Sequence, residues 1–329
     1  MSRPRKNPAD RWMPDRVYKN QSSYVFKPRG TRQTITLCNL DAPKHKVIQL
    51  WEAERKKLEQ PTNTLSSLAD EFFASEHFLG LAASTQRDYR DKNAPKVLAV
   101  FGKMDRNKVR PEHIRAYMDK RGLKSRVQAN REKSFLSMLY QWGYERGRVK
   151  GNPCKGVRSF TEKARTRYIT DDEYAAVFKA GDAVVRKAME IAYCCGLRTA
   201  DVLGMKRSQF QEEGIVVKQQ KNGTTDIREW SPRLRAAIET KLPGPSSATY
   251  VIHNAQGQAI TSSAFRTRWK KAKDKAALQD PDLVFDFTFH DIKAKAVSDY
   301  EGNKQDFSGH KTAAMVAVYD RKMKRVKSH

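Results

Sequence analysis

Apolar and polar positions follow a helical period over most of this chain. Between residues 64 and 158 the spacing predicts four helices: one from Leu65, one over about 84–101, one from Pro111 and one over about 126–144. A proline at the first turn favours the third of these starts. Each helix has one apolar side, so the four are expected to pack into a single helical domain that ends at Gly151-Asn152-Pro153.

The first 60 residues have a different pattern. Short β-type runs at 23–27 and 34–37 are separated by the turn signal Pro28-Arg29-Gly30, and a helix with a charged outer face is expected over 47–58. A sheet of two or three strands with one helix is too small for an enzyme but suits an auxiliary binding module. Gln60-Pro61-Thr62-Asn63 is the expected linker.

A third pattern begins after residue 165. Thr170 followed by Glu173 predicts a capped helix start, and one hairpin is expected from 214–218 and 225–228, turned at Lys221-Asn222-Gly223. Further helices are expected at about 231–240, 261–277, 289–300 and 311–319. The fold class is therefore mainly α with small β parts, divided into domains at 1–60, 62–158 and 165–329.

The net charge of the chain indicates which class of partner it binds. The chain of 329 residues carries 64 Lys and Arg against 37 Asp and Glu, a net charge of +27. Such an excess implies a polyanionic partner, most economically DNA or RNA, with acidic lipid or ribosomal RNA as the alternatives. In the helical domain the basic residues opposite the apolar stripes are candidates for groove contacts, although a solvated face would look the same: Arg87, Arg90, Lys92, Arg126, Arg131 and Lys133.

Other features of the sequence argue against three classes of protein: membrane-spanning, secreted and metal-binding proteins. No apolar run is long enough for a membrane helix, and the start has no apolar segment of the secretory type. The four cysteines (Cys38, Cys154, Cys194 and Cys195) lack metal-ligand spacing, so we expect no metal site and a reducing, cytoplasmic location.

Candidate chemistry lies in the last third of the chain. Gly196 is expected to end one helix, and Thr199 to begin the next, which places Arg198 at a helix N-terminus that favours anions. An ordinary ion pair with Asp201 is the alternative. Lys221 lies at the hairpin tip, where a flexible amine can reach a substrate oxygen, but a solvated turn lysine is equally ordinary there and Lys218 is a competitor.

The order of the remaining candidates is more informative than any one of them. His290 and Lys293 lie one helical turn apart and share a face. Gly309-His310 precedes a helix that carries Tyr319, nine residues after the histidine. Cleaving a phosphodiester through a tyrosine requires fixed cations, an in-line nucleophile and an acid for the departing oxygen. This set of side chains offers a candidate for each role.

In this order and spacing the chain resembles the tyrosine recombinases, or phage integrases. Residues 195–203, Cys-Gly-Leu-Arg-Thr-Ala-Asp-Val-Leu, are similar to the first arginine box of that family, and Ser308-Gly309-His310 with Tyr319 is similar to its last box. The helical segment is similar to its core-binding domain, and residues 1–60 to the arm-binding domain of lambda-type members. The departure is Lys293, where the family usually has arginine, whose planar fork lysine lacks.

The resemblance implies a function and roles for these residues. Tyr319 would form a 3′-phosphotyrosyl link, and Arg198, His290 and His310 would hold and neutralise the phosphate. Lys293 would keep the positive charge of the usual arginine, Lys221 would act as general acid, and Asp201 would orient its neighbours. Tyr300 is a poor rival nucleophile, since it precedes His310 on the helix of His290.

It also implies partners. Double-stranded DNA with attachment-type sites, a homotetramer on DNA, and a directionality factor or host DNA-bending protein are expected, with no cofactor and no membrane. Integration or excision of a mobile element in the nucleoid of a bacterial cell is the leading interpretation. A Xer-like dimer resolvase, a type IB topoisomerase and a non-catalytic DNA-binding regulator remain the alternatives.

Overall fold

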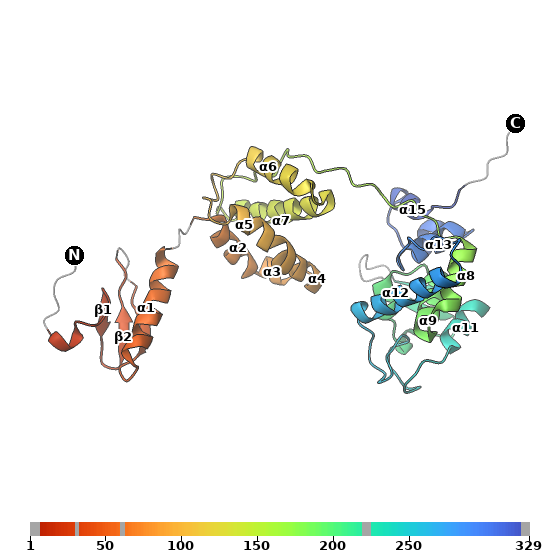
Figure 1. The fold of residues 1–329 in the computed structure, drawn as a ribbon, viewed down its shortest axis with the longest axis horizontal. Coiled ribbons are helices and arrows are strands. Elements are labelled where there is room, and N and C mark those ends of the chain that lie inside the picture. The colour runs from red at the N-terminus through yellow and green to blue at the C-terminus, as the bar shows by residue number, and fades with distance from the viewer. Residues whose placement is uncertain (1–6, 30–32, 60–62, 219–224, 324–329) are drawn as a thin grey trace. The chain divides into compact units, whose positions relative to one another are not determined.

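The computed structural model describes residues 7–29, 33–59, 63–218 and 225–323 (Figure 1). The chain divides into two compact units, Met1–Glu162 and Lys163–His329. Helices dominate both units, and the two small sheets are antiparallel. Among the described residues, no helix is both long and apolar enough to cross a membrane.

The first unit opens with a sheet of three strands and one helix. After the short helix η1 (Pro8–Asp10), β1 (Val17–Lys19), β2 (Ser23–Phe26) and β3 (Ile35–Asn39) pair in sequence order, with a register shift between Tyr24 and Val25. Helix α1 (Lys44–Glu59) contributes Val47 to a small core that also holds Met13, Val17, Tyr24 and Phe26. The two predicted strands and the helix are confirmed, and β1 is added. Of the predicted linker Gln60-Pro61-Thr62-Asn63, residues 60–62 lie outside the described residues.

The rest of this unit is helical and has its own core. The elements are α2 (Leu65–Phe73), α3 (Glu76–Leu79), α4 (Ala83–Arg87), η2 (Asp88–Asn93), α5 (Ala94–Phe101), α6 (Pro111–Gly122) and α7 (Arg126–Glu145). Helix α7 contacts α2, α5 and α6, and its apolar side is buried through Phe135, Leu136, Leu139, Tyr140 and Trp142. One acidic side chain, Glu132, is fully buried there, where it binds Tyr117 and Arg121.

The predicted helix over 84–101 has the expected extent but is interrupted. Residues Asp88–Asn93 form a π-helical turn, and the N–H of Ala94 donates to the carbonyl of Tyr89, five residues back. Pro95 follows immediately. Because proline has no N–H and its ring clashes with the carbonyl four residues earlier, a regular α-helix is disfavoured there, and the wider turn avoids that conflict.

The second unit is a mixed, mostly helical domain. In order it contains α8 (Asp171–Ala180), α9 (Ala183–Cys195), α10 (Thr199–Leu203), η3 (Arg207–Gln209), β4 (Gly214–Lys218), β5 (Thr225–Glu229), α11 (Pro232–Glu239), α12 (Ser262–Gln279), α13 (Asp291–Asp299), α14 (Lys304–Ser308) and α15 (Ala313–Tyr319). The capping box of Thr170 and Glu173 is confirmed, as is the pairing of β4 with β5. The short helix α14 was not predicted.

Two features of this unit prepare the site. Helix α9 ends at Gly196, whose φ of 61° is left-handed and whose Cα faces the ring of Phe307 so closely that an added Cβ would lie 2.8 Å from that ring. This sharp turn places Arg198 directly before α10, at the N-cap position of that helix. Helix α13 is buried along its length, so its ionisable residues Asp291, Lys293 and Lys295 lie in the protein interior.

Candidate active site

His290 and Tyr319 meet at the N-terminal end of α13. His290 is the residue that precedes this helix, Tyr319 is the last residue of α15, and the imidazole Nε2 lies 3.2 Å from the phenol oxygen. The ring of His310 lies beside the same tyrosine, with 4.5 Å between ring centroids. Tyr319 is half-buried and His310 is buried. Three side chains that the sequence singled out therefore converge in space.

Lys293 contacts both the turn that precedes His310 and the ring of Tyr319. Its side chain is fully buried, its Nζ donates to the carbonyl of Ser308 at 2.9 Å, and it lies 5.8 Å from the ring centroid of Tyr319. Ser308 in turn hydrogen-bonds through Oγ to His310 Nδ1 at 2.9 Å. Gly309 between them has a φ of 64°, which closes α14 and turns His310 inward. The lysine thus holds the turn that presents His310.

Arg198 belongs to the same electrostatic environment. The pKa of the Lys293 amine is lowered to about 7, chiefly by burial and also by the positive charge of Arg198, while Asp201 opposes the change. Desolvation also lowers the pKa of His290; Asp291 opposes the change, and Lys293 and Arg198 reinforce it. Basic groups whose pKa is lowered by neighbouring positive charge are arranged for an anion.

The protonation state of His290 follows from this environment. Because its pKa is below the ordinary value of 6.5, the imidazole is largely neutral at pH 7. A neutral imidazole within hydrogen-bond distance of a phenol can accept the phenolic proton. The site can therefore generate a nucleophilic oxygen beside a group of cations.

Three residues important to the site were missed by sequence reasoning. Arg228 on β5 donates to the carbonyl of Phe307 at 2.8 Å and pairs with Asp226 at 3.1 Å, beside the turn of His310. On this strand Asp226 and Arg228 are half-buried while Ile227 is 43% exposed, the reverse of the usual alternation. No sequence signal predicts that reversal. Asp291 and Arg321, the other two, are joined by an ion pair of 2.7 Å.

Five basic residues follow Tyr319, and for such a stretch the sequence leaves three hypotheses open: contact with DNA, contact with a neighbouring protomer, or a disordered basic tail. Its first member behaves otherwise, because only 7% of the Arg321 side chain is exposed and it binds within its own chain. Lys322 lies 3.4 Å from Asp299. Lys324, Arg325 and Lys327 lie outside the described residues.

The remaining candidates stand as follows. Lys221 and the hairpin turn lie outside the described residues, and its competitor Lys218 is exposed at the end of β4. Tyr300 stacks on Phe307 with ring centroids 4.2 Å apart. Among the described residues, no group of three or more His, Cys, Asp or Glu side chains is placed to hold a metal ion.

Of the six basic residues predicted to contact a groove, five make local contacts, and Arg87 is exposed at the end of α4. Arg90 lies over the ring of Phe78 and Arg126 over that of Phe160, while Lys92 pairs with Asp88, Arg131 with Glu162, and Lys133 with Val157 O and Ser159 Oγ. These contacts leave the DNA-binding role a prediction.

Comparison with known proteins gives consistent results. Residues 167–325 match the model of the phage integrase family. Curated relatives include the integrase of Escherichia phage HK022, 25% identical over 204 residues (57% of this chain and 56% of that protein), and the integrase of Escherichia phage lambda, 22% identical over 205 residues (57% and 56%). The matched part spans about half the length of these relatives.

Solved structures share the fold. A lambda integrase dimer bound to a COC′ core site has a TM-score of 0.69 at 18% identity, covering 96% of this chain and 98% of that one. A lambda integrase tetramer bound to a Holliday junction has a TM-score of 0.65 at 17% identity, covering 95% and 98%. The Tn1549 transposon integrase in complex with circular intermediate DNA has a TM-score of 0.63 at 15% identity, covering 79% and 96%.

Proposed function

We propose that this chain, whose residues 167–325 match the model of the phage integrase family, is a site-specific DNA recombinase that cuts and rejoins DNA through Tyr319. The observation that carries the proposal is the contact of 3.2 Å between His290 Nε2 and the Tyr319 hydroxyl, with His310 beside it and Lys293 beneath. The net charge of +27 supplies the attraction to a nucleic acid.

Each step has an assigned side chain. The Tyr319 oxygen attacks phosphorus as its proton passes to His290, and the bond from phosphorus to the 5′ oxygen breaks. Arg198, His310 and Lys293 balance the charge that grows on the phosphate oxygens. Lys221 protonates the departing 5′ oxygen, and Asp201 orients Arg198 and its neighbours.

The reverse reaction with a new 5′ hydroxyl restores the DNA. Because one phosphodiester is exchanged for another ester of similar energy, the reaction itself requires no nucleotide hydrolysis and no resident cofactor. Full strand exchange needs two duplexes and four active sites, so we propose a homotetramer on double-stranded DNA with attachment-type sites. The lambda integrase tetramer on a Holliday junction, which shares this fold, supports that assembly.

We also propose which DNA site each of the three segments of the chain binds. Residues 62–158 and 165–329 clamp the core site, and residues 1–60 hold a second, distant site. The separate small core of the first segment supports its independence. This arrangement favours integration or excision of a mobile element in the bacterial nucleoid, with a directionality factor or host DNA-bending protein as assistant, over a dimer resolvase or a type IB topoisomerase.

The proposal is tested by covalent capture. The full-length protein first selects its site from a random duplex library, and the selected duplex is then nicked beside the scissile phosphate so that the released fragment diffuses away. We expect a protein–DNA adduct on a denaturing gel that is lost in Tyr319→Phe and retained in Tyr300→Phe, the matched control on the same unit. Specific binding without any adduct would instead identify a DNA-binding regulator.

A further inference from the structure

The backbone around Tyr319 is fastened to α13 by residues of the same chain. Ser298 Oγ on α13 donates to the carbonyl of Tyr319 at 3.0 Å and accepts from the N–H of Arg321 at 2.7 Å. Asp320 pairs with Lys304 at 2.9 Å. The segment is thus held directly after the tyrosine, where small shifts would move the phenol oxygen.

Helix α15 itself provides little anchoring. None of its residues is buried, and Met315 and Val318 are 48% and 38% exposed. Because apolar burial is the main non-directional source of stability, an exposed helix of seven residues is weakly held by its own side chains. The position of Tyr319 depends on the polar contacts that follow it.

The centre of these contacts is the Asp291 carboxylate, directly after His290 in the chain. It is 1% exposed; Oδ2 accepts from the N–H and the Oγ1 of Thr288, both at 2.8 Å, and Oδ1 accepts from Arg321 Nη1 at 2.7 Å. Burial would raise the pKa of Asp291, but the hydrogen bonds from Thr288 and Arg321 outweigh it and lower the pKa. Asp291 is therefore a fixed anion that joins the segment of His290 to the segment of Tyr319.

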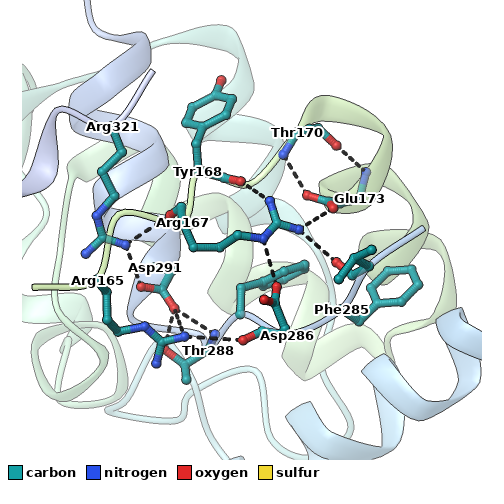
Figure 2. A network of polar contacts seen from close by, with 12 residues as sticks. Arg165, Arg167, Tyr168, Thr170, Glu173, Phe285, Asp286, Thr288, Asp291 and Arg321 are labelled. Carbon is teal, nitrogen blue, oxygen red and sulfur yellow. Dashed lines mark hydrogen bonds and ion pairs between the residues drawn. The ribbon is translucent and has the colours of Figure 1, made fainter. Parts of the chain in front are cut away.

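Two further arginines complete the network (Figure 2). Arg165 Nη2 lies 3.2 Å from Asp291 Oδ2, and Arg321 Nη1 also donates to the carbonyl of Arg167 at 3.1 Å. The Arg167 side chain binds Asp286 and Glu173. Arg165 thus contacts the same carboxylate, and the carbonyl of Arg167 holds the guanidinium of Arg321.

We propose that Asp291 and Arg321 form a positioning pair that holds the Tyr319 hydroxyl at His290, braced by Arg165 and Arg167. Neither residue of the pair touches the reacting phosphate; Arg321 acts through the backbone of residues 319–321, and Asp291 through the start of α13. The inference rests on the proposed function, because the purpose of the pair is to place a nucleophile.

The first test compares Arg321→Gln and Asp291→Asn with Arg268→Gln, which removes another Arg–Asp pair of the same unit, Arg268 with Asp182. With saturating protein on the nicked, selected duplex, adduct formation should slow by about 10²-fold in the first two variants, since a displacement on the order of 1 Å has that effect. DNA affinity should change less than about twofold in all three. Equal losses of affinity and cleavage rate would overturn the proposal.

A second measurement separates positioning from damage to the site. In a Tyr319→Phe background, hydroperoxide can attack the phosphorus in place of the phenol, forming a new P–O bond as the 5′ oxygen leaves as a hydroxyl. This small nucleophile needs no placement by the protein. Adding Arg321→Gln should leave peroxide cleavage within about twofold, because the phosphate-binding side chains are untouched. A peroxide rate that falls as far as the tyrosine rate would refute the positioning role.

Two further variants test whether Asp291 and Arg321 act together as a pair. The double variant Asp291→Asn/Arg321→Gln should lose no more cleavage than the worse single variant, since the two side chains act as one unit; additive losses would contradict the pair. Arg321→Lys keeps the charge but has a shorter side chain and lacks the Nε–H that donates to the carbonyl of Val318 at 3.1 Å. An intermediate rate is therefore expected, and a rate as low as that of Arg321→Gln would count against the proposal. No adduct from the wild-type protein would refute the proposed function instead, whatever the variants do.

Discussion

The lowered pKa of the buried Lys293 amine leads to a prediction about proton uptake on DNA binding. Its pKa of about 7 in the free protein results from burial and from the charge of Arg198, so at pH 8 the amine is largely neutral. An active-site phosphate about 5 Å away would stabilise the charged form by about 3 kcal/mol at an effective dielectric constant of about 20. That energy raises the pKa of the Lys293 amine when DNA is bound.

DNA binding should therefore take up protons. Because the pKa of about 7 in the free protein rises on binding, each site takes up most of a proton at pH 8, where the free amine is largely neutral, and little at pH 6, where it is already charged. The sign follows from the bound state holding more protons: affinity falls as pH rises between about 7 and 9, with a logarithmic slope that approaches −1 per site.

Calorimetry measures this directly. Binding enthalpies for the selected duplex at pH 8 in Tris and in HEPES, which differ in ionisation enthalpy, give the number of protons taken up. Lys293→Arg is the matched control, because guanidinium stays charged and removes the titration. The reasoning is refuted if the wild type takes up no protons at pH 8, or if Lys293→Arg takes up as many.

Three other predictions concern the same chain. Lys293→Ala should lose far more cleavage than DNA affinity, measured by adduct formation and by gel shift, and an equal loss of both would make Lys293 purely structural. The logarithm of the binding constant should fall with the logarithm of salt concentration with a slope of order −10 if about ten phosphates are neutralised per protomer, and a slope near zero would remove the electrostatic argument. Gly196→Ala should destabilise the protein by about 1–3 kcal/mol in urea unfolding, because φ is 61° and the added Cβ would lie 2.8 Å from Phe307; an unchanged midpoint would contradict the strained turn.

Local signals in the sequence predicted much of the fold. The capping box at Thr170 and the β4–β5 hairpin depend on residues close in the chain, so their positions could be predicted. Gly196 before Arg198 predicted the break between α9 and α10 for the same reason. The π turn before Pro95 was missed because helical periodicity continues across it, although the proline itself is a signal for it.

Part of the candidate site could likewise be predicted from the sequence, and part could not. The order of His290, Lys293, His310 and Tyr319 predicted a set of side chains that the structure brings together, and their catalytic roles stay predictions. The role of Arg321 could not be predicted, because its partner, Asp291, is 30 residues away and the sequence gives no sign of their contact. The role of Arg228 likewise depends on which side of β5 faces the protein.

Mass spectrometry of the trapped adduct tests the central claim most directly. A selected duplex with a sulfur in place of the bridging 5′ oxygen accumulates the cleaved state, since the thiol that leaves is a poor nucleophile for the return reaction. After protease and nuclease digestion, we predict one modified peptide, with a 3′-linked nucleotide on Tyr319. A nucleotide on any other residue, or a 5′ linkage, would contradict the account.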